Sequence, residues 1–592
     1  MSFDQLAPFL RRVQKPARYI GGEPGAVNAE EKKKAKPLRY ALCFPDTYEI
    51  GMSHLGMKIL YAAANRRTDV LCERVFAPDS DMESEIRKAN LPLWGLESLE
   101  PICAFDIIGF TLQYEMCCTN VLNMLDLAHI PLRASNRTAA HPIVIAGGPC
   151  CVNPEPLAPF FDVFVLGEGE EVQDELLDLL IAHKQGTRDR LAFLAAAAKL
   201  EGCYIPAIHT DPSVRIRKRI VRDLDNAFFP DTFVTPLIEV VQDRASTELF
   251  RGCIRGCRFC QAGFMTRPVR TKAPETAEAQ VRSLCANTGY DEINLSSLST
   301  SDYEQLPELL EHMNEWTVPA KIKVSVPSLR IDAFSQEVMD KLALVRRAGL
   351  TFAPEAGTQR LRDVINKNIT EAQILDTVRR AFAAGWTSVK LYFMMGLPTE
   401  TDEDITGIAD LAQKVVDEFY RNPDKPKGKG VTVSVSVAVF VPKPCTPFQW
   451  EAMDSREEIL RKQALLRASI RSRKISLHTH DMETGLLEGV FARGDRRLAD
   501  VIETAWQNGA KFDAWDDRFQ PDIWKAAFRA HGLTYAGFLR ERSETEPLPW
   551  DRFDYGVSAA FLLRERKKAY AEQTTANCRE QCCGCGAGCG SV

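Results

Sequence analysis

The sequence contains no stretch that approaches the roughly 18 uninterrupted apolar residues of a membrane span. Met1–Pro16 mixes apolar side chains with Arg11, Arg12 and Lys15, and it lacks the apolar block and small-residue cleavage site of a signal peptide. Excess charge is also small, because the formal net charge is −6, so bulk nucleic acid is not an expected ligand. We therefore expect a cytoplasmic protein with no membrane partner.

Low-complexity segments and internal repeats are absent as well. The 592 residues are 45% hydrophobic and 26% charged, as in soluble globular proteins, and this length predicts two to four domains. The pattern along the chain divides it into six parts: a lead-in at 1–36, an α/β domain at 37–185, a linker or β extension at 186–237, a second α/β domain at 238–470, a helical region at 471–573 and a cysteine-rich tail at 574–592.

Short apolar runs alternate with amphipathic stretches in 37–185, which predicts a parallel, doubly wound Rossmann-type sheet. The expected strands are Arg39–Phe44, Val70–Phe76, Asp106–Leu112, Ile143–Ala146 and Val163–Leu166. The expected helices are Leu55–Asn65, Met82–Lys88 and Val172–His183. Such sheets bind ligands where their strands end, so the loops with Gly147 and Gly148 and with Gly167 and Glu168 are candidate cofactor contacts or simply tight turns.

The chain does contain 18 cysteines, and we do not expect them to form disulfides because the cytoplasm is reducing. Three fall in Arg251-Gly-Cys253-Ile-Arg-Gly-Cys257-Arg-Phe-Cys260, a Cys-x3-Cys-x2-Cys arrangement. Three thiolates on one short loop can ligate three irons of a 4Fe-4S cluster and leave the fourth iron for the amino and carboxyl groups of S-adenosylmethionine (SAM). Zinc is the weaker alternative, because structural zinc sites have four ligands.

These motifs resemble the radical SAM superfamily, in particular its cobalamin-binding-domain subgroup and an uncharacterised bacterial family within it. The resemblance covers nearly the whole chain and implies a partial (β/α)6 barrel, a type of TIM barrel, at 238–470. It further implies that Phe259 packs on the adenine of SAM and that the segments after later barrel strands approach the rest of SAM. Those residues are Ser325, Ser328, Arg330, Glu355 and Gly396.

Two departures from the family pattern bear on cofactor binding. Many relatives carry acidic residues after the second barrel strand, where this chain has Ser296 and Ser297, so hydroxyls or another group must hold the SAM amine. Cobalamin ligation through Asp-x-His-x-x-Gly is not matched around His54, because no aspartate stands two residues earlier and Gly56 comes too soon. His54 is therefore expected to begin a helix or line the cofactor pocket, with the axial ligand of cobalamin as the alternative, and cobalamin binding and its loss both stay open.

The tail carries a second cysteine group. Cys578, Cys582 and Cys585 repeat the Cys-x3-Cys-x2-Cys spacing, and Cys583 or Cys589 can complete four ligands. We expect an auxiliary 4Fe-4S cluster here, with structural zinc and metal-free thiols as the alternatives.

The predicted function is a radical SAM enzyme that cleaves SAM reductively and functionalises, or methylates, an unactivated carbon. The alternative is a cluster-bearing sensor or assembly protein that binds SAM or cobalamin without turnover. Catalysis requires a low-potential electron donor, for which a flavodoxin or ferredoxin is expected. The sequence does not name the substrate; RNA or ribosomal material is one class considered, although no recognised RNA-binding module is present.

Overall fold

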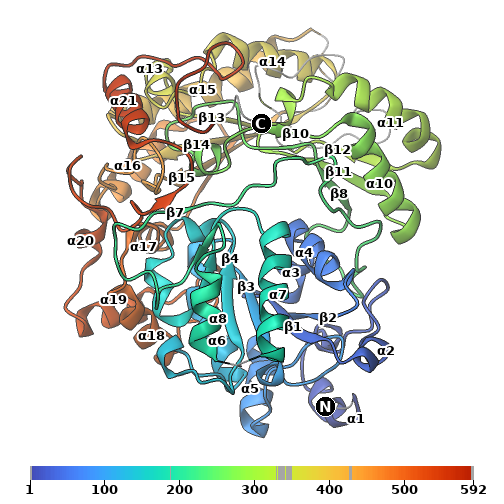
Figure 1. Cartoon of the computed structure of the whole chain (residues 1–592). Coiled ribbons are helices and arrows are strands. Elements are labelled where there is room, and N and C mark those ends of the chain that lie inside the picture. Colours follow the sequence, from blue (N-terminus) through green and yellow to red (C-terminus); the bar gives the residue numbers. More distant parts are fainter. Residues whose placement is uncertain are drawn as a thin grey trace.

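A computed structural model describes residues 3–186, 189–327, 330, 341, 350–423, 425, 428 and 430–588. Two α/β domains face each other and a mainly helical region runs along one side of both (Figure 1). None of the helices in these residues has the length and apolar character needed to cross a bilayer.

The first domain is built on one twisted sheet whose strand order is β2-β1-β3-β4-β5-β6. The strands are β1 (Leu38–Phe44), β2 (Val70–Phe76), β3 (Ile107–Thr111), β4 (Ile143–Gly147), β5 (Val163–Val165) and β6 (Cys203–Tyr204). The first five are parallel and β6 is antiparallel, so the predicted doubly wound domain is confirmed. Because the chain changes direction across the sheet between β1 and β3, the ligand crevice of such a fold lies at the ends of these two strands.

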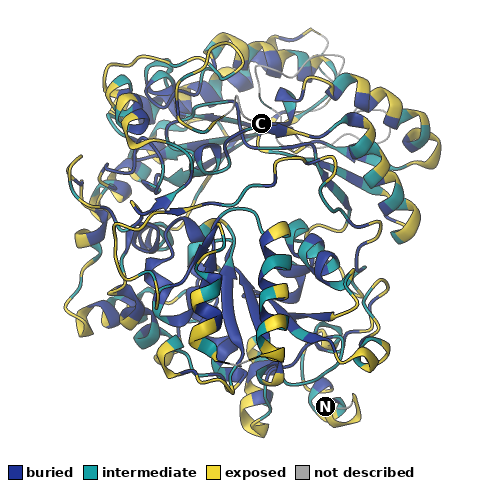
Figure 2. Cartoon of the chain, viewed as in Figure 1, coloured by how far each residue is buried: buried dark blue, intermediate teal, exposed yellow. Residues whose placement is uncertain are grey.

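Helices cover both faces of this sheet, and Figure 2 shows the buried strands between helices with exposed outer faces. They are α4 (Leu55–Asn65), α5 (Ser80–Ala89), α6 (Cys118–Leu127), α7 (Glu170–Gln185) and α8 (Arg190–Ala197). The bounds of α4 agree with the sequence prediction. Helix α6 was not predicted; nearly all of its residues are buried, including the polar Thr119, Asn120 and Asn123, so it has little of the exposed face of a surface helix.

The second domain consists of two groups of parallel strands. One group is β8 (Ala245–Glu248), β11 (Glu292–Ser296) and β12 (Lys323–Ser325). The other is β13 (Leu350–Glu355), β14 (Ser388–Met395), β15 (Thr432–Val439) and β16 (Ile475–Thr479). The helices between them include α10 (Pro274–Thr288), α11 (Leu306–Ala320), α14 (Glu371–Ala383) and α15 (Asp402–Arg421). The expected barrel-type α/β arrangement is present, and β16 adds a parallel strand beyond residue 470.

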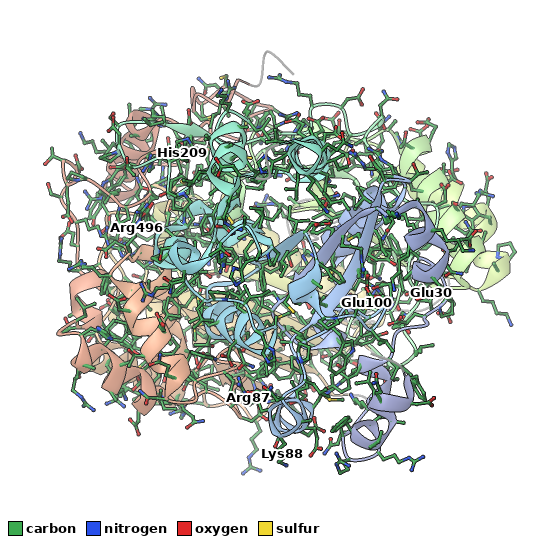
Figure 3. All side chains as sticks on the ribbon, turned by 60° about the horizontal axis from the view of Figure 1, so that its bottom comes forward. Glu30, Arg87, Lys88, Glu100, His209 and Arg496 are labelled. Carbon is green, nitrogen blue, oxygen red and sulfur yellow. The ribbon has the colours of Figure 1, made fainter. Side chains whose placement is uncertain are left out.

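The helical region consists of α16 (Arg456–Ser469), α17 (Met482–Arg493), α18 (Leu498–Gln507), α19 (Pro521–Ala530), α20 (Tyr535–Leu539) and α21 (Ala559–Tyr570). It binds the first domain through polar contacts: Arg496 donates to Glu155 at 2.6 Å, and Arg552 donates to the carbonyl of His209 at 2.9 Å. Arg496 and His209 are labelled in Figure 3. A short parallel pairing of β7 (Ile216–Arg217) with β17 (Phe553–Asp554) also joins the linker to this region.

Candidate active site

The cysteine loop follows β8 at the edge of the second domain. It begins after β9 (Phe250–Arg251), which pairs antiparallel with β10 (Arg270–Thr271), so a small hairpin closes the loop. The loop ends at Cys260, which caps α9 (Gln261–Met265), and its Sγ accepts a hydrogen bond from the amide of Gly263 at 3.4 Å. The hairpin and the helix cap therefore fix both ends of the loop.

The three thiols of the loop lie close enough to affect one another electrostatically. Burial raises the pKa of Cys253 to about 11, and the neighbouring Cys257 adds to this effect. Burial likewise raises the pKa of Cys260 to about 12. Both groups are thus neutral at pH 7 until a metal displaces the proton. No three His, Cys, Asp or Glu side chains within the described ranges are arranged to hold a single ion. A cubane cluster has a different requirement, one thiolate for each of three irons, and three thiols on one loop suit it.

A segment that the sequence did not single out holds this loop in place. Asn366 donates to the carbonyl of Gly256 at 3.1 Å, and the amide of Arg258 donates to the carbonyl of Ile365 at 2.9 Å. Lys367, in the same segment, lies near Cys257. Apolar and polar residues follow one another in no regular order in this segment, so periodicity in the sequence could not have indicated its role.

Hydroxyls or another group were expected in place of the usual acidic residues after the second barrel strand, and an acidic residue does lie slightly further along the chain. Asp302, shortly after β11, accepts hydrogen bonds from Arg255 of the cysteine loop, the longer being 2.9 Å, and another from Ser299 at 2.6 Å. Ser297 bonds Thr300 at 2.8 Å. The hydroxyls and the carboxylate after this strand are therefore already engaged with the loop and with one another.

Most of the residues expected to contact SAM lie at the carboxyl ends of the barrel strands. Ser325 ends β12 and Glu355 ends β13, where Lys367 pairs with Glu355 at 3.0 Å. Gly396 follows β14 and donates its amide to Glu400 at 2.9 Å. Phe259 packs beside a small apolar cluster that includes Leu397.

Arg330 is also on this side, since its guanidinium donates to the carbonyl of Lys367 at 3.0 Å. Ser328 lies outside the described residues. The described residues of the set thus surround the cysteine loop from β12, β13 and β14.

A cavity of about 360 Å³ lies between the two domains. From the first domain it is lined by His54, Thr111 and Gly147, and from the second by Glu248, Arg251 and Ser296 among others. It therefore joins the crevice of the doubly wound sheet to the strand that leads into the cysteine loop. The hydroxyl oxygen of Thr111 is buried in this wall and has no hydrogen-bond partner among the described residues. The sequence feature that could have indicated Thr111 is a polar residue at the end of an otherwise apolar strand.

His54 has a structural role at the cavity wall. It is the N-cap of α4, where its Nδ1 accepts a hydrogen bond from the amide of Met57 at 3.2 Å. Burial lowers the pKa of His54, although a hydrogen bond with Gln113 opposes this effect. The expectation that His54 begins a helix or lines a pocket agrees with this position.

The glycines of the two sheet-end loops differ in role. Gly148 has φ +109°, and a Cβ there would lie 2.6 Å from the carbonyl oxygen of Leu112. Gly167 has φ +93°, and its Cβ would lie 2.1 Å from the carbonyl oxygen of Arg219. Close backbone packing therefore accounts for both. At Gly147 the nearest atom to a Cβ is 3.9 Å away, so this glycine leaves room in the cavity.

Glu168 joins the two domains. Its carboxylate accepts two hydrogen bonds of 2.7 Å from Arg270 of β10 and one of 2.6 Å from the amide of Val221. Arg251 of β9 lies 3.3 Å away. All of these contacts are protein groups, so Glu168 holds the hairpin of the cysteine loop against the first domain.

The cysteine-rich tail packs onto the same loop. The amide of Cys578 donates to the carbonyl of Ile254 at 3.0 Å. Cys583 and Cys585 hydrogen-bond each other, Cys585 is buried, and Cys582 is exposed. Cys589 lies outside the described residues. The structure thus brings Cys585 together with Cys583, one of the two cysteines expected to complete the set.

Comparison with known families and proteins gives a consistent picture. Residues 56–206 match the model of the N-terminal domain of radical SAM proteins, and residues 247–412 match that of the radical SAM superfamily. The cysteine loop falls at the start of the second match.

Two relatives align with substantial parts of the chain. The uncharacterised protein MJ0966 of Methanocaldococcus jannaschii is 28% identical over 472 residues, which are 78% of this chain and 90% of that protein. The anaerobic magnesium-protoporphyrin IX monomethyl ester cyclase of Cereibacter sphaeroides is 28% identical over 256 residues, 42% of this chain and 40% of the cyclase. Among solved structures, the cobalamin-dependent SAM radical enzyme OxsB with aqua-cobalamin and SAM bound has a TM-score of 0.50 at 13% identity. That match covers 91% of this chain and 80% of OxsB and shows a shared fold.

Proposed function

Because the chain belongs to the radical SAM superfamily, we propose that it uses a 4Fe-4S cluster on Cys253, Cys257 and Cys260 to cleave SAM and functionalise an unactivated carbon. We propose further that a cobalamin binds at the cavity between the domains, with only part of the cofactor inside it, and that the reaction is a methyl transfer. The observation that carries this proposal is the position of the cavity, which lies at the crevice of a doubly wound sheet and reaches Arg251, two residues before the first cysteine.

The chain supplies three things at the cluster. The thiols provide the ligands, the amide of Gly263 donates to the Cys260 sulfur, and the Asn366 side chain holds the loop through the carbonyl of Gly256. A 4Fe-4S cluster held by these thiols would supply the low-potential electron that reductive cleavage of SAM requires. These contacts hold the cysteine loop near the ends of the barrel strands, where we propose that SAM binds.

Charged groups at those strand ends suit the two charged groups of the methionine part of SAM. Arg330 and Lys367 provide positive charge for the carboxylate, and Glu355 provides negative charge for the amine. Phe259 offers an aromatic surface at the end of the loop for the adenine. The family resemblance implies Phe259, Arg330 and Glu355, whereas Lys367 is added because it pairs with Glu355.

The fit of the cavity to a cobalamin rests on its lining. Thr111 offers a buried hydroxyl without a partner, and an unpaired buried hydroxyl is costly unless a ligand or water satisfies it. Gly147 leaves open space at the end of β4. His54 Nδ1 accepts a hydrogen bond at the cap of α4, so the neutral ring carries its proton on Nε2, and we propose that the cofactor binds without His54 as its ligand. Cobalamin, when bound, supplies a methyl carrier.

The first experiment is anaerobic reconstitution of the full chain with iron and sulfide, followed by reduction with dithionite in the presence of SAM. We expect 5′-deoxyadenosine in the wild-type protein and its loss in Cys257→Ala. The matched control is Cys285→Ala, a half-buried cysteine on α10, which should retain the product. A cluster-replete wild-type protein that forms no 5′-deoxyadenosine would instead favour the non-catalytic sensor.

The second experiment tests the cavity with hydroxocobalamin alone, followed by its optical spectrum after gel filtration. Gly147→Leu fills the open space at the end of β4 and should reduce cobalamin retention at least tenfold without changing the iron content. Gly537→Leu, at an exposed helical position with similar room for a Cβ, is the matched control. Equal retention by both variants, or none by the wild type, would contradict a cobalamin in this cavity.

For the remaining partners we propose a flavodoxin or ferredoxin as the electron source and a cytoplasmic location, in keeping with an oxygen-sensitive cluster. The substrate enters between the barrel mouth and the first domain. RNA or ribosomal material stays one class to be screened once SAM cleavage is established.

A further inference from the structure

Arg267 is a buried cation whose charge is not matched by a carboxylate. It is 2% exposed, and no Asp or Glu within the described ranges forms an ion pair with it. Two other buried arginines of the same region are paired, Arg258 with Glu565 at 3.1 Å and Arg270 with Glu168 at 2.7 Å. A buried charge is costly unless its polar atoms are satisfied, and Arg267 is compensated by backbone carbonyls, by the rings of Phe264 and Phe561 and by sulfur.

Cysteines of the tail surround this guanidinium. Nη1 of Arg267 lies 3.6 Å from Sγ of Cys583, and the group is also within electrostatic range of Cys578 and Cys585. The other nitrogens donate to backbone carbonyls, Nε to Gly263 and Nη2 to Arg255. Within the described ranges, the acidic groups next to this guanidinium are the tail cysteines, which become thiolates when they bind a metal.

The tail is also held in a definite position. Asn366 accepts a hydrogen bond from the amide of Thr575 at 2.7 Å, and Asn368 donates to the carbonyl of Thr575 at 2.9 Å. Nearer the thiols, Ser558 donates its amide to the carbonyl of Cys585 at 2.9 Å, and Arg564 donates to that of Cys583 at 2.7 Å. The backbone is thus fixed before any metal binds, which lowers the entropic cost of assembling a site.

We propose that Cys578, Cys583 and Cys585, with Cys582 as the fourth ligand, hold a second 4Fe-4S cluster whose negative charge Arg267 balances. A disulfide between two of these thiols would be neutral and would leave the buried guanidinium unmatched. Iron is favoured over zinc because the tail site adjoins the loop of the first cluster. Arg267 contacts both Cys583 and the carbonyl of Arg255, and the amide of Cys578 donates to the carbonyl of Ile254. This site is independent of the cobalamin and of the substrate.

The test uses the full chain, reconstituted anaerobically with ferric iron and sulfide, with iron, sulfide and zinc counted per chain. The wild type should hold about eight irons, as expected for two cubane clusters. The triple variant Cys253→Ala, Cys257→Ala, Cys260→Ala should keep about four irons and show a reduced 4Fe-4S signal in electron paramagnetic resonance. The double variant Cys583→Ala, Cys585→Ala should also hold about four and still form 5′-deoxyadenosine.

A triple variant that holds no iron, or one zinc per chain and no sulfide, would overturn the proposal. Since this variant lacks the first cluster, its result does not depend on whether SAM is cleaved. Circular dichroism of each variant verifies folding, and Cys285→Ala is the control for loss of a cysteine elsewhere.

The role of Arg267 is measured in the triple variant by redox titration. Arg267→Gln should shift the midpoint potential of the tail cluster to more negative values, because a nearby positive charge favours the reduced form. Arg267→Lys keeps the charge and should restore most of the shift. Equal potentials in wild-type, Gln and Lys forms would show that Arg267 does not face the cluster.

Discussion

The carboxylate of Glu168 provides the sharpest test of how the two domains are joined. Sequence analysis offered it as a cofactor contact, whereas the structure pairs it with Arg270 and the amide of Val221. Glu168→Gln preserves size and removes the charge, which leaves Arg270, a side chain only 2% exposed, without its anion. Breaking a buried pair in this way lowers the free energy of unfolding by about 3–5 kcal/mol. Because Glu168 is 17% exposed, we expect the lower end of this range, about 3 kcal/mol.

The matched control lies nearby in the same loop and helix. Glu171→Gln removes a carboxylate that pairs with Arg219 at 2.8 Å but is 48% exposed, so its loss should cost about 0–1 kcal/mol. The assay is anaerobic urea unfolding of the reconstituted protein, with the free energy of unfolding compared between variants. Adding Arg270→Met to each gives a double-mutant cycle, in which only Glu168 should couple to Arg270.

The pH dependence of the same pair has a defined sign. Burial tends to raise the pKa of Glu168, but hydrogen bonds from Arg270 and the charge of Arg251 outweigh it and lower the pKa below its ordinary value. The stabilisation is therefore present above the unfolded pKa of about 4.3 and is lost as the pH falls through the folded value. The difference between wild type and Glu168→Gln should shrink below about pH 4. Equal free energies of unfolding for Glu168→Gln and Glu171→Gln, with weakened cofactor binding in the former, would refute the pairing and restore the cofactor role.

Three further predictions follow from single side chains. His54→Asn keeps an N-cap acceptor on α4, so thermal stability and the optical spectrum of bound cobalamin should both be retained, whereas a spectral change would identify His54 as a ligand. Asp79 pairs with Arg518 at 2.7 Å, and its pKa is lowered to about 2 because hydrogen bonds from Arg518 and other groups outweigh its burial. Asp79→Asn should therefore lower the free energy of unfolding by about 1–2 kcal/mol at pH 7. Denaturant unfolding should show this difference declining as the pH falls from about 4 toward 2. Trp524 is fully buried and donates to Asp513 at 2.9 Å, so Trp524→Ala should lower the free energy of unfolding by about 3–5 kcal/mol, and a loss below about 1 kcal/mol would contradict this packing.

Local patterns predicted most of the elements that position the site. The helix at Leu55–Asn65 and the strands of the first sheet could be read from apolar periodicity, because burial of one face repeats at the period of the element itself. Helix α6 escaped the same reasoning, since nearly all of its residues are buried and it packs against α18. The strand β16 was similarly placed in a helical region, because five residues that alternate weakly give little signal.

By itself the sequence determined the cysteine loop at Cys253–Cys260, the two α/β patterns and the glycine-rich loops at the strand ends, because each is a short-range feature of spacing or composition. Only the tertiary structure decided which groups meet across long separations in the chain. It paired Glu168 with Arg270, directed Cys583 to Arg267 and placed Thr111 in a cavity that reaches Arg251. The physical reason is that ion pairs, buried hydrogen bonds and cavities depend on how separate elements pack, and no periodicity along one element records its neighbour.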